Sequence, residues 1–121
     1  MRIATRVAVG VFLFSVVVAA QAPLRRTVVA TWYGKAYHGR ITASGERFDM
    51  DKYTIACNWL PLKTVVELTY GEQTVLAWVS DRMADGTADG RIDVSAAIAE
   101  VQGWTKRGKV KMTLEVKNGR I

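Results

Sequence analysis

Residues 30–50 constrain the fold more than any other segment of this chain, because they hold glycines and aromatic residues with no helical period. Gly34, Gly39 and Gly45 interrupt the segment at intervals typical of loops and turns. Glu46 follows Gly45 directly. A segment of this kind is poor at building a helix and suited to shaping a groove, so we expect a long loop beside a groove.

The segments around this loop have the composition of short strands. They are rich in β-branched and aromatic residues, and the last of them alternates between an apolar and a polar face. The expected strands and extended segments cover residues 27–33, 53–57, 64–70, 74–80, 92–94 and 109–117. Gly71-Glu72-Gln73 separates the third from the fourth, which predicts a hairpin with a three-residue loop.

A single short helix is expected. Ser95 is placed as an N-cap for residues 96–102, and Gly103 follows as a C-terminal stop. Asp93 is expected to support the turn into this helix. Many short strands, frequent turns and one small helix favour a closed all-β barrel over a layered α/β fold.

The N-terminus reads as a secretory signal peptide. An uncharged apolar run over residues 7–20 follows two arginines, and at about 14 residues it is shorter than the roughly 20 needed to span a bilayer. We expect cleavage after Ala20, because cleavage after Ala22 would leave Pro23 directly after the cut. An uncleaved membrane anchor is the alternative.

The chain then divides into a leader over residues 1–20 and one barrel domain over residues 21–121. No cysteine stands at the end of the leader, so a lipid anchor is not expected there. We expect the mature protein to be periplasmic or secreted, without a stable membrane anchor, and monomeric.

The charge and the cysteine count narrow the class of partner. The net charge is +6, and it falls to +4 if Arg2 and Arg6 leave with the signal peptide. Because the basic residues are spread along the chain, an anionic envelope polymer fits better than nucleic acid. Cys57 is the only cysteine, which rules out an intramolecular disulfide. One histidine and one cysteine do not make a metal site, so neither a metal nor a cofactor is expected.

Four motifs follow one another along the chain. They are Trp32-Tyr33-Gly34 with His38-Gly39-Arg40 and Thr42-Ala43-Ser44-Gly45-Glu46, Tyr53-Thr54-Ile55-Ala56-Cys57 with Leu60-Pro61, Val79-Ser80-Asp81-Arg82, and Gly90-Arg91-Ile92-Asp93-Val94-Ser95-Ala96-Ala97. Their order and spacing resemble the signature of the rare lipoprotein A family, bacterial cell-envelope proteins. The resemblance implies a six-stranded double-psi β-barrel with one short helix, the fold of expansins and barwin-like proteins, and a groove that binds polysaccharide.

Several members of that family are septal lytic transglycosylases that cleave peptidoglycan. The resemblance assigns functional roles to Glu46 and Asp81. A third functional residue of the family is a histidine that falls on Cys57 here, and a thiol cannot reproduce the two-sided hydrogen bonding of an imidazole. The chain also has Met83-Ala84 where the family usually has Gly-Pro, and Lys63 where it usually has a small turn residue.

Asp81 is the candidate catalytic acid and base. In a lytic transglycosylase the C6 hydroxyl of N-acetylmuramic acid attacks its own anomeric carbon, so one carboxyl can carry out both proton transfers. Asp81 ends an apolar strand, which should make its backbone rigid and its side chain partly desolvated. Glu46 is expected across the groove, orienting sugar hydroxyls or stabilising oxocarbenium-like charge. The alternative is that Asp81 pairs with Arg82 or Arg91 and only closes a loop.

The remaining candidates concern substrate binding. Trp32, Tyr33 and Tyr37 could stack on sugar rings, and His38 and Arg91 are further candidate contacts. The tryptophans expected in the core are Trp59, Trp78 and Trp104. Cys57 is expected to be a buried apolar residue, with a Cys57–His38 nucleophilic pair as the alternative.

Three functions are compatible with these features. The first is an exported lytic transglycosylase that acts on peptidoglycan glycan strands and leaves 1,6-anhydro ends. The second is a non-catalytic, expansin-like barrel that binds polysaccharide. The third is an interaction domain or inhibitor that uses the barrel as a scaffold, and nothing positive in the sequence supports it.

Overall fold

The computed structural model describes residues 24–84 and 89–120, so the expected signal peptide and its cleavage site lie outside the described residues. The elements are β1 Arg25–Tyr33, β2 Thr54–Ala56, β3 Thr64–Tyr70, β4 Gln73–Asp81, β5 Arg91–Ser95, α1 Ala96–Val101 and β6 Lys109–Arg120, with a 3-10 turn at Lys35–Tyr37. Within the described ranges, no helix is long and apolar enough to cross a membrane.

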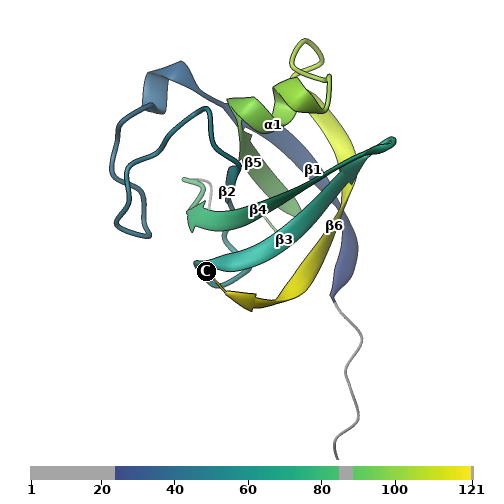
Figure 1. Cartoon of the computed structure of the whole chain (residues 1–121), viewed down its shortest axis with the longest axis horizontal. Coiled ribbons are helices and arrows are strands. Elements are labelled where there is room, and N and C mark those ends of the chain that lie inside the picture. The colour runs from purple at the N-terminus through teal and green to yellow at the C-terminus, as the bar shows by residue number, and fades with distance from the viewer. Residues whose placement is uncertain (1–23, 85–88, 121) are drawn as a thin grey trace, which may run out of the picture.

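The six strands close into a barrel in the order β1, β5, β2, β4, β3, β6. β1 runs parallel to β5 and β2 runs parallel to β4, whereas the other neighbouring strands are antiparallel. Figure 1 shows the loop between β1 and β2 standing out from the barrel at the left, and α1 lying across its upper end. The prediction of an all-β, six-stranded barrel with one short helix is confirmed.

The core is filled by alternate residues of the strands. On β6 the buried side chains are Val110, Met112 and Leu114, as the alternation of residues 109–117 predicted. On β5, Ile92 and Val94 point inward and are fully buried. Since successive side chains of a strand point to opposite faces, the residues between them are presented on the outer surface of the barrel.

Three local predictions differ from the structure in detail. The hairpin loop has two residues rather than three, because Tyr70 pairs with Gln73 and Gln73 begins β4. Ser95 occupies the N-cap position of α1 as predicted, but its hydroxyl makes no cap hydrogen bond and donates to the Lys52 carbonyl instead. Trp78 is not a core residue: it lies between the inward-facing Ala77 and Val79 on β4 and is only half-buried.

Candidate active site

The loop between β1 and β2 is fixed to the barrel by backbone contacts. Ile41 and Arg47 form a β-bridge that closes the tip of the loop on itself. The Ser44 N–H donates to the Ser80 carbonyl at 3.0 Å, and the Ala97 N–H donates to the Met50 carbonyl at 3.0 Å. The loop is therefore attached both to the end of β4 and to the start of α1.

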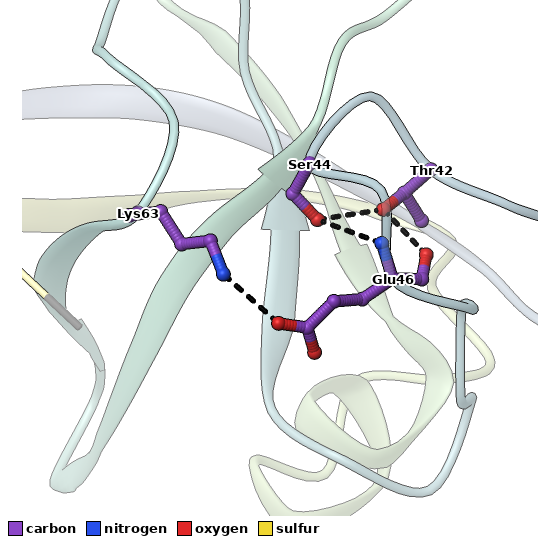
Figure 2. Close-up of polar contacts among 4 residues, drawn as sticks. All are labelled: Thr42, Ser44, Glu46 and Lys63. Carbon is purple, nitrogen blue, oxygen red and sulfur yellow. Dashed lines mark hydrogen bonds and ion pairs between the residues drawn. The ribbon is translucent and has the colours of Figure 1, made fainter.

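A tight turn over residues 42–46 positions Glu46. Gly45 adopts a φ of +91°, a backbone conformation that residues other than glycine rarely adopt. The Thr42 hydroxyl donates to the Glu46 carbonyl at 2.7 Å and lies 2.8 Å from the Ser44 hydroxyl (Figure 2). The Thr-x-Ser-Gly-Glu sequence thus builds its own hydrogen-bonded turn, with the Glu46 side chain leaving from its end.

Lys63 holds the Glu46 carboxylate. Its Nζ lies 2.9 Å from Glu46 Oε2 (Figure 2) and 4.9 Å from the centre of the Trp78 ring. The Glu46 side chain is 59% exposed and that of Lys63 is 32% exposed, so water screens the pair. Sequence analysis expected Glu46 in the groove but did not predict this partner.

Asp81 is held through one of its two carboxylate oxygens. Oδ1 accepts the Ala43 N–H at 3.0 Å and the Arg82 N–H at 2.8 Å. The Arg82 guanidinium points elsewhere, to the carbonyls of Cys57 and Leu60. Among the described residues Asp81 forms no ion pair, and Oδ2 accepts no hydrogen bond. Its carboxyl is therefore oriented by the backbone and keeps one oxygen available.

A cavity of about 400 Å³ lies in front of Asp81, and we call it the Asp81 cavity. It is lined by Trp32, Tyr33, Tyr37, Ala56, Asp81, Arg82, Met83, Ala84 and Asp93. It brings together Asp81 and the three aromatic residues predicted to contact sugar. That combination of stacking surfaces and a carboxyl is what a glycan site needs.

A second carboxylate, Asp93, lines the same cavity. Asp81 and Asp93 are both registered with Ala56, one across β4–β2 and the other across β2–β5, so they stand two strands apart in one row. Neighbouring strands are about 4.8 Å apart, which separates their backbones by about 10 Å. The Thr31 hydroxyl donates to Asp93. Asp93 therefore lines the cavity instead of supporting the turn into α1. Its place between the inward-facing Ile92 and Val94 could have indicated only that its side chain points away from the core.

Tyr33 lines the Asp81 cavity and also packs against the loop between β1 and β2. Its ring stacks on Phe48 with centroids 4.3 Å apart. Burial, followed by the charges of Asp81 and Asp93, raises the pKa of the Tyr33 hydroxyl far above its ordinary value of 10.0, against a small lowering by Ser80. Tyr33 therefore stays protonated throughout the range in which the protein would work.

A second cavity, of about 270 Å³, contains Glu46, and we call it the Glu46 cavity. It is lined by Thr42, Glu46, Arg47, Phe48, Asp49, Lys52, Thr54, Trp78 and Ser80. It lies beside the Asp81 cavity, since Phe48 of one lining stacks on Tyr33 of the other. The two predicted catalytic carboxyls therefore line neighbouring cavities rather than the same one.

Three predicted residues lie outside both cavities. His38 is exposed, and its Nδ1 accepts the Met50 N–H at 3.2 Å. Arg91 is half-buried, and its carbonyl accepts the Trp59 indole N–H. Cys57 is 0% exposed and belongs to the core, as its apolar interpretation predicted. The alternative Cys57–His38 pair is absent from the described structure, because His38 lies in the exposed loop.

Solved structures define the class of fold. A Streptomyces papain inhibitor superposes with a TM-score of 0.63 at 22% identity, over 77% of this chain and 94% of that chain. A Clavibacter michiganensis expansin in complex with cellohexaose superposes with a TM-score of 0.66 at 15% identity, over 81% of this chain and 52% of that one. The protein is a double-psi β-barrel of the expansin and barwin-like type. At these identities the likeness concerns the fold alone.

Curated relatives give the more particular relationship. The chain is 37% identical over 98 residues to the endolytic peptidoglycan transglycosylase RlpA of Neisseria meningitidis, covering 78% of this chain and 40% of the relative. It is 40% identical over 91 residues to RlpA of Vibrio cholerae, covering 72% of this chain and 34% of the relative. No family model matches the chain. The chain is thus homologous to the rare lipoprotein A proteins, as its motifs indicated, and spans less than half the length of these two relatives.

Proposed function

We propose that this protein is an exported lytic transglycosylase that cleaves the bond between N-acetylmuramic acid and N-acetylglucosamine in peptidoglycan and leaves 1,6-anhydro ends. The observation that carries the proposal is the way in which the Asp81 carboxyl is held in a cavity lined by aromatic residues. One oxygen is fixed by two backbone N–H groups and the other is free among the described residues. The relatives from Neisseria meningitidis and Vibrio cholerae are endolytic peptidoglycan transglycosylases, which supports the same reaction class.

The free Oδ2 of Asp81 could carry out both proton transfers of the proposed reaction. With Oδ1 accepting two N–H groups, a protonated Asp81 would carry its proton on Oδ2 and donate it to the leaving glycosidic oxygen. As the C1–O bond breaks, the muramic C6 oxygen forms a new bond to C1. The Asp81 carboxylate then accepts the proton of that C6 hydroxyl, which closes the anhydro ring and restores the acid without water.

The other acids would act electrostatically. Positive charge develops at the anomeric carbon as the bond breaks, and the carboxylate of Asp93 lies in the same cavity. Glu46, in the adjoining cavity, would orient sugar hydroxyls. Trp32 and Tyr37 offer faces on which the sugar rings would stack.

The test is mass spectrometry of purified glycan strands after incubation with the protein. We expect 1,6-anhydromuramic ends, reduced at least about a hundredfold in Asp81→Asn, since an amide at this position cannot exchange the proton. Asp51→Asn, an exposed acid outside both cavities, is the matched control and should keep full activity. Reducing ends in place of anhydro ends, or full activity of Asp81→Asn, would refute the mechanism.

A non-catalytic polysaccharide-binding barrel is the second candidate. Two observations favour it: Lys63 occupies the Glu46 carboxylate, and the family histidine is replaced by a fully buried Cys57. Co-sedimentation with glycan strands, without any new chain ends, would select this function over cleavage.

A further inference from the structure

A further cavity, of about 460 Å³, lies at the start of β6, and we call it the basic cavity. It is lined by Val29, Tyr70, Arg107, Lys109, Val110 and Lys111. These described residues include no acid, and the three cations among them are exposed. The basic cavity shares no lining residue with the Asp81 cavity or the Glu46 cavity. It is therefore a separate place at which a ligand can be held while the Asp81 cavity is occupied.

Two of the three cations take their direction from the alternation of β6. Lys109 and Lys111 stand on either side of Val110, which is 5% exposed and belongs to the core. Their side chains therefore leave the same outer face of the strand. Their partners on β1 are Thr31 and Val29, neither of which carries a charge. The two ammonium groups are thus presented on one face of the sheet, with no acid opposite them on β1.

Arg107 is placed by the turn that leads into β6. Trp104, at the start of this turn, is fully buried, and its carbonyl accepts the Arg107 N–H at 3.0 Å. The Trp32 indole N–H donates to the carbonyl of Thr105, in the same turn, at 3.1 Å. The turn is therefore anchored both to the core and to β1, and it holds the backbone of Arg107 in a fixed place at the cavity.

These cations are not neutralised within the described part of the chain. None of the three forms an ion pair there, whereas Glu115, the acid further along β6, is paired with Arg25 and Lys117. Three like charges around one cavity repel one another, and a ligand with several negative charges would relieve that repulsion. Because the three side chains are exposed, each single contact is weak and screened by salt. The basic cavity therefore favours a polyanion, which makes several contacts at once, over a single small anion.

The uncharged part of the lining narrows the class of polyanion. Val29 and Tyr70 supply apolar surface and an aromatic ring, against which the C–H face of a sugar can pack. A membrane surface fits less well, because peripheral proteins bind membranes through exposed apolar side chains that lie beside the basic ones. None of the large apolar side chains that are exposed in the described chain lines this cavity: Leu24, Tyr37, Ile41, Tyr53, Leu76 and Val101.

We propose that the basic cavity binds an acidic polysaccharide, a chain of sugars that carry carboxylate groups. The ammonium groups of Lys109 and Lys111 and the guanidinium of Arg107 would meet the carboxylates, and Tyr70 would lie against a sugar ring. The inference does not depend on cleavage at Asp81. It gives the protein a second point of attachment, through a polymer other than the glycan of the proposed reaction.

The test compares two hexamers with the same β-1,4 linkage, one of glucuronic acid and one of glucose, which differ only in the carboxylate at C6. In isothermal titration calorimetry at low salt, the purified chain should bind the glucuronic acid hexamer at least about tenfold more tightly. Added salt should weaken binding of the acidic hexamer and leave binding of the neutral one unchanged.

Variants locate the binding. Lys109→Gln with Lys111→Gln should weaken binding of the acidic hexamer about fivefold to tenfold and make its salt dependence shallower. Arg25→Gln with Lys117→Gln is the matched control, because it removes the same charge from β1 and β6 but at cations that Glu115 pairs, and it should keep the affinity. Lys109→Arg with Lys111→Arg retains both charges and should bind at least as well as the parent.

Four results would overturn the inference. They are equal affinity of the parent for the two hexamers, the same loss of affinity in the glutamine variant and its control, the same loss in the arginine variant, and binding of anionic lipid vesicles or single-stranded DNA without binding of the acidic hexamer. An equal loss in the control would mean that only the overall charge of the chain attracts the ligand. The proposed cleavage is judged separately, because 1,6-anhydro ends are measured on peptidoglycan strands.

Discussion

Lys63 combines an unfavourable backbone conformation with a contact at the candidate site. Its φ of 74° lies in the left-handed region, where a side chain costs about 1–2 kcal/mol. Its N–H donates to the Val79 carbonyl at 2.7 Å, which fixes the turn against β4. The same residue brings its ammonium to within 2.9 Å of Glu46, so a contact at the site coincides with a local cost in stability.

Replacing Lys63 should separate these two effects. Lys63→Gly relieves the left-handed φ and should be about 0.5–1 kcal/mol more stable than Lys63→Ala, which keeps that φ. Both variants lose the exposed ion pair equally, so the difference between them isolates the backbone. Urea denaturation measures it, and equal stability of the two variants would show that the turn is not strained.

The site residues that sequence analysis predicted were identified from local features of the sequence. Asp81 was predicted because it ends an apolar strand within a motif, and Tyr33 because it is an aromatic residue that could stack on a sugar ring. Thr54 and Asp93 could not be assigned in this way. They reach the cavities through strand pairing across β2, and the register between distant strands is not written in any local pattern.

Among the elements, α1 is joined to the hairpin of β3 and β4 by the buried side-chain amide of Gln102, the residue directly after the helix. The Gln102 side-chain amide donates to the carbonyls of Leu68 and Gln73, at 3.1 and 3.3 Å. Its oxygen accepts the indole N–H of Trp104 at 3.0 Å. All the polar atoms of this 5% exposed side chain are thus used, and it joins three segments of the fold.

Removing that amide should weaken the whole barrel. Gln102→Leu leaves the Trp104 N–H and the Leu68 carbonyl without these partners in a buried place, which we expect to cost about 2–3 kcal/mol. Gln73→Ala is the matched control, because only its backbone carbonyl takes part and its side chain is exposed. The free energy of unfolding from urea titration measures the cost. A loss below that of the control would show that the amide is dispensable.

The alternation of apolar and polar residues predicted the strands well. Polar residues were a poorer guide to the contacts at the ends of helices. The inward and outward faces of β6 followed directly from residues 109–117. Ser95 precedes α1 as expected, yet its hydroxyl bonds to Lys52, a residue that lies near it only in the folded chain. A cap is a competition among nearby partners, and the tertiary partner wins here.

At the scale of the whole molecule, two buried acids limit stability in alkaline solution. Burial raises the pKa of the Cys57 thiol above its ordinary value of 9.0, although the backbone of Trp59 and Leu60 and the charges of Arg82 and Arg26 oppose the shift. The pKa of Tyr33 is raised as well, mainly by burial. For each group the unfolded chain releases its proton first, so stability is complete below the unfolded pKa and falls as pH rises.

Cys57→Ala should flatten this pH dependence. Between about pH 8 and pH 10 the parent should lose stability that the variant, which has no thiol to ionise, retains. The slope of unfolding free energy against pH is the readout, because the smaller side chain also lowers stability equally at every pH. Parallel slopes for the two proteins would mean that Cys57 does not ionise on unfolding in this range.

The closed barrel itself was within reach of sequence analysis, whereas its strand order was not. Short strands, frequent turns and four motifs in order predicted closure and the double-psi fold. The parallel pairings of β1 with β5 and of β2 with β4 join segments far apart in the chain. The composition of these strands carries no information about such long-range pairings.

Closure between the first strand and the last has a consequence for biosynthesis. β1 is paired on one side with β5 and on the other with β6, the final element of the fold. During translation β1 therefore leaves the ribosome with neither of its neighbours made, and no partial barrel can close around it. The barrel can close only when Lys109–Arg120 is available, so we expect closure to be the last step of folding.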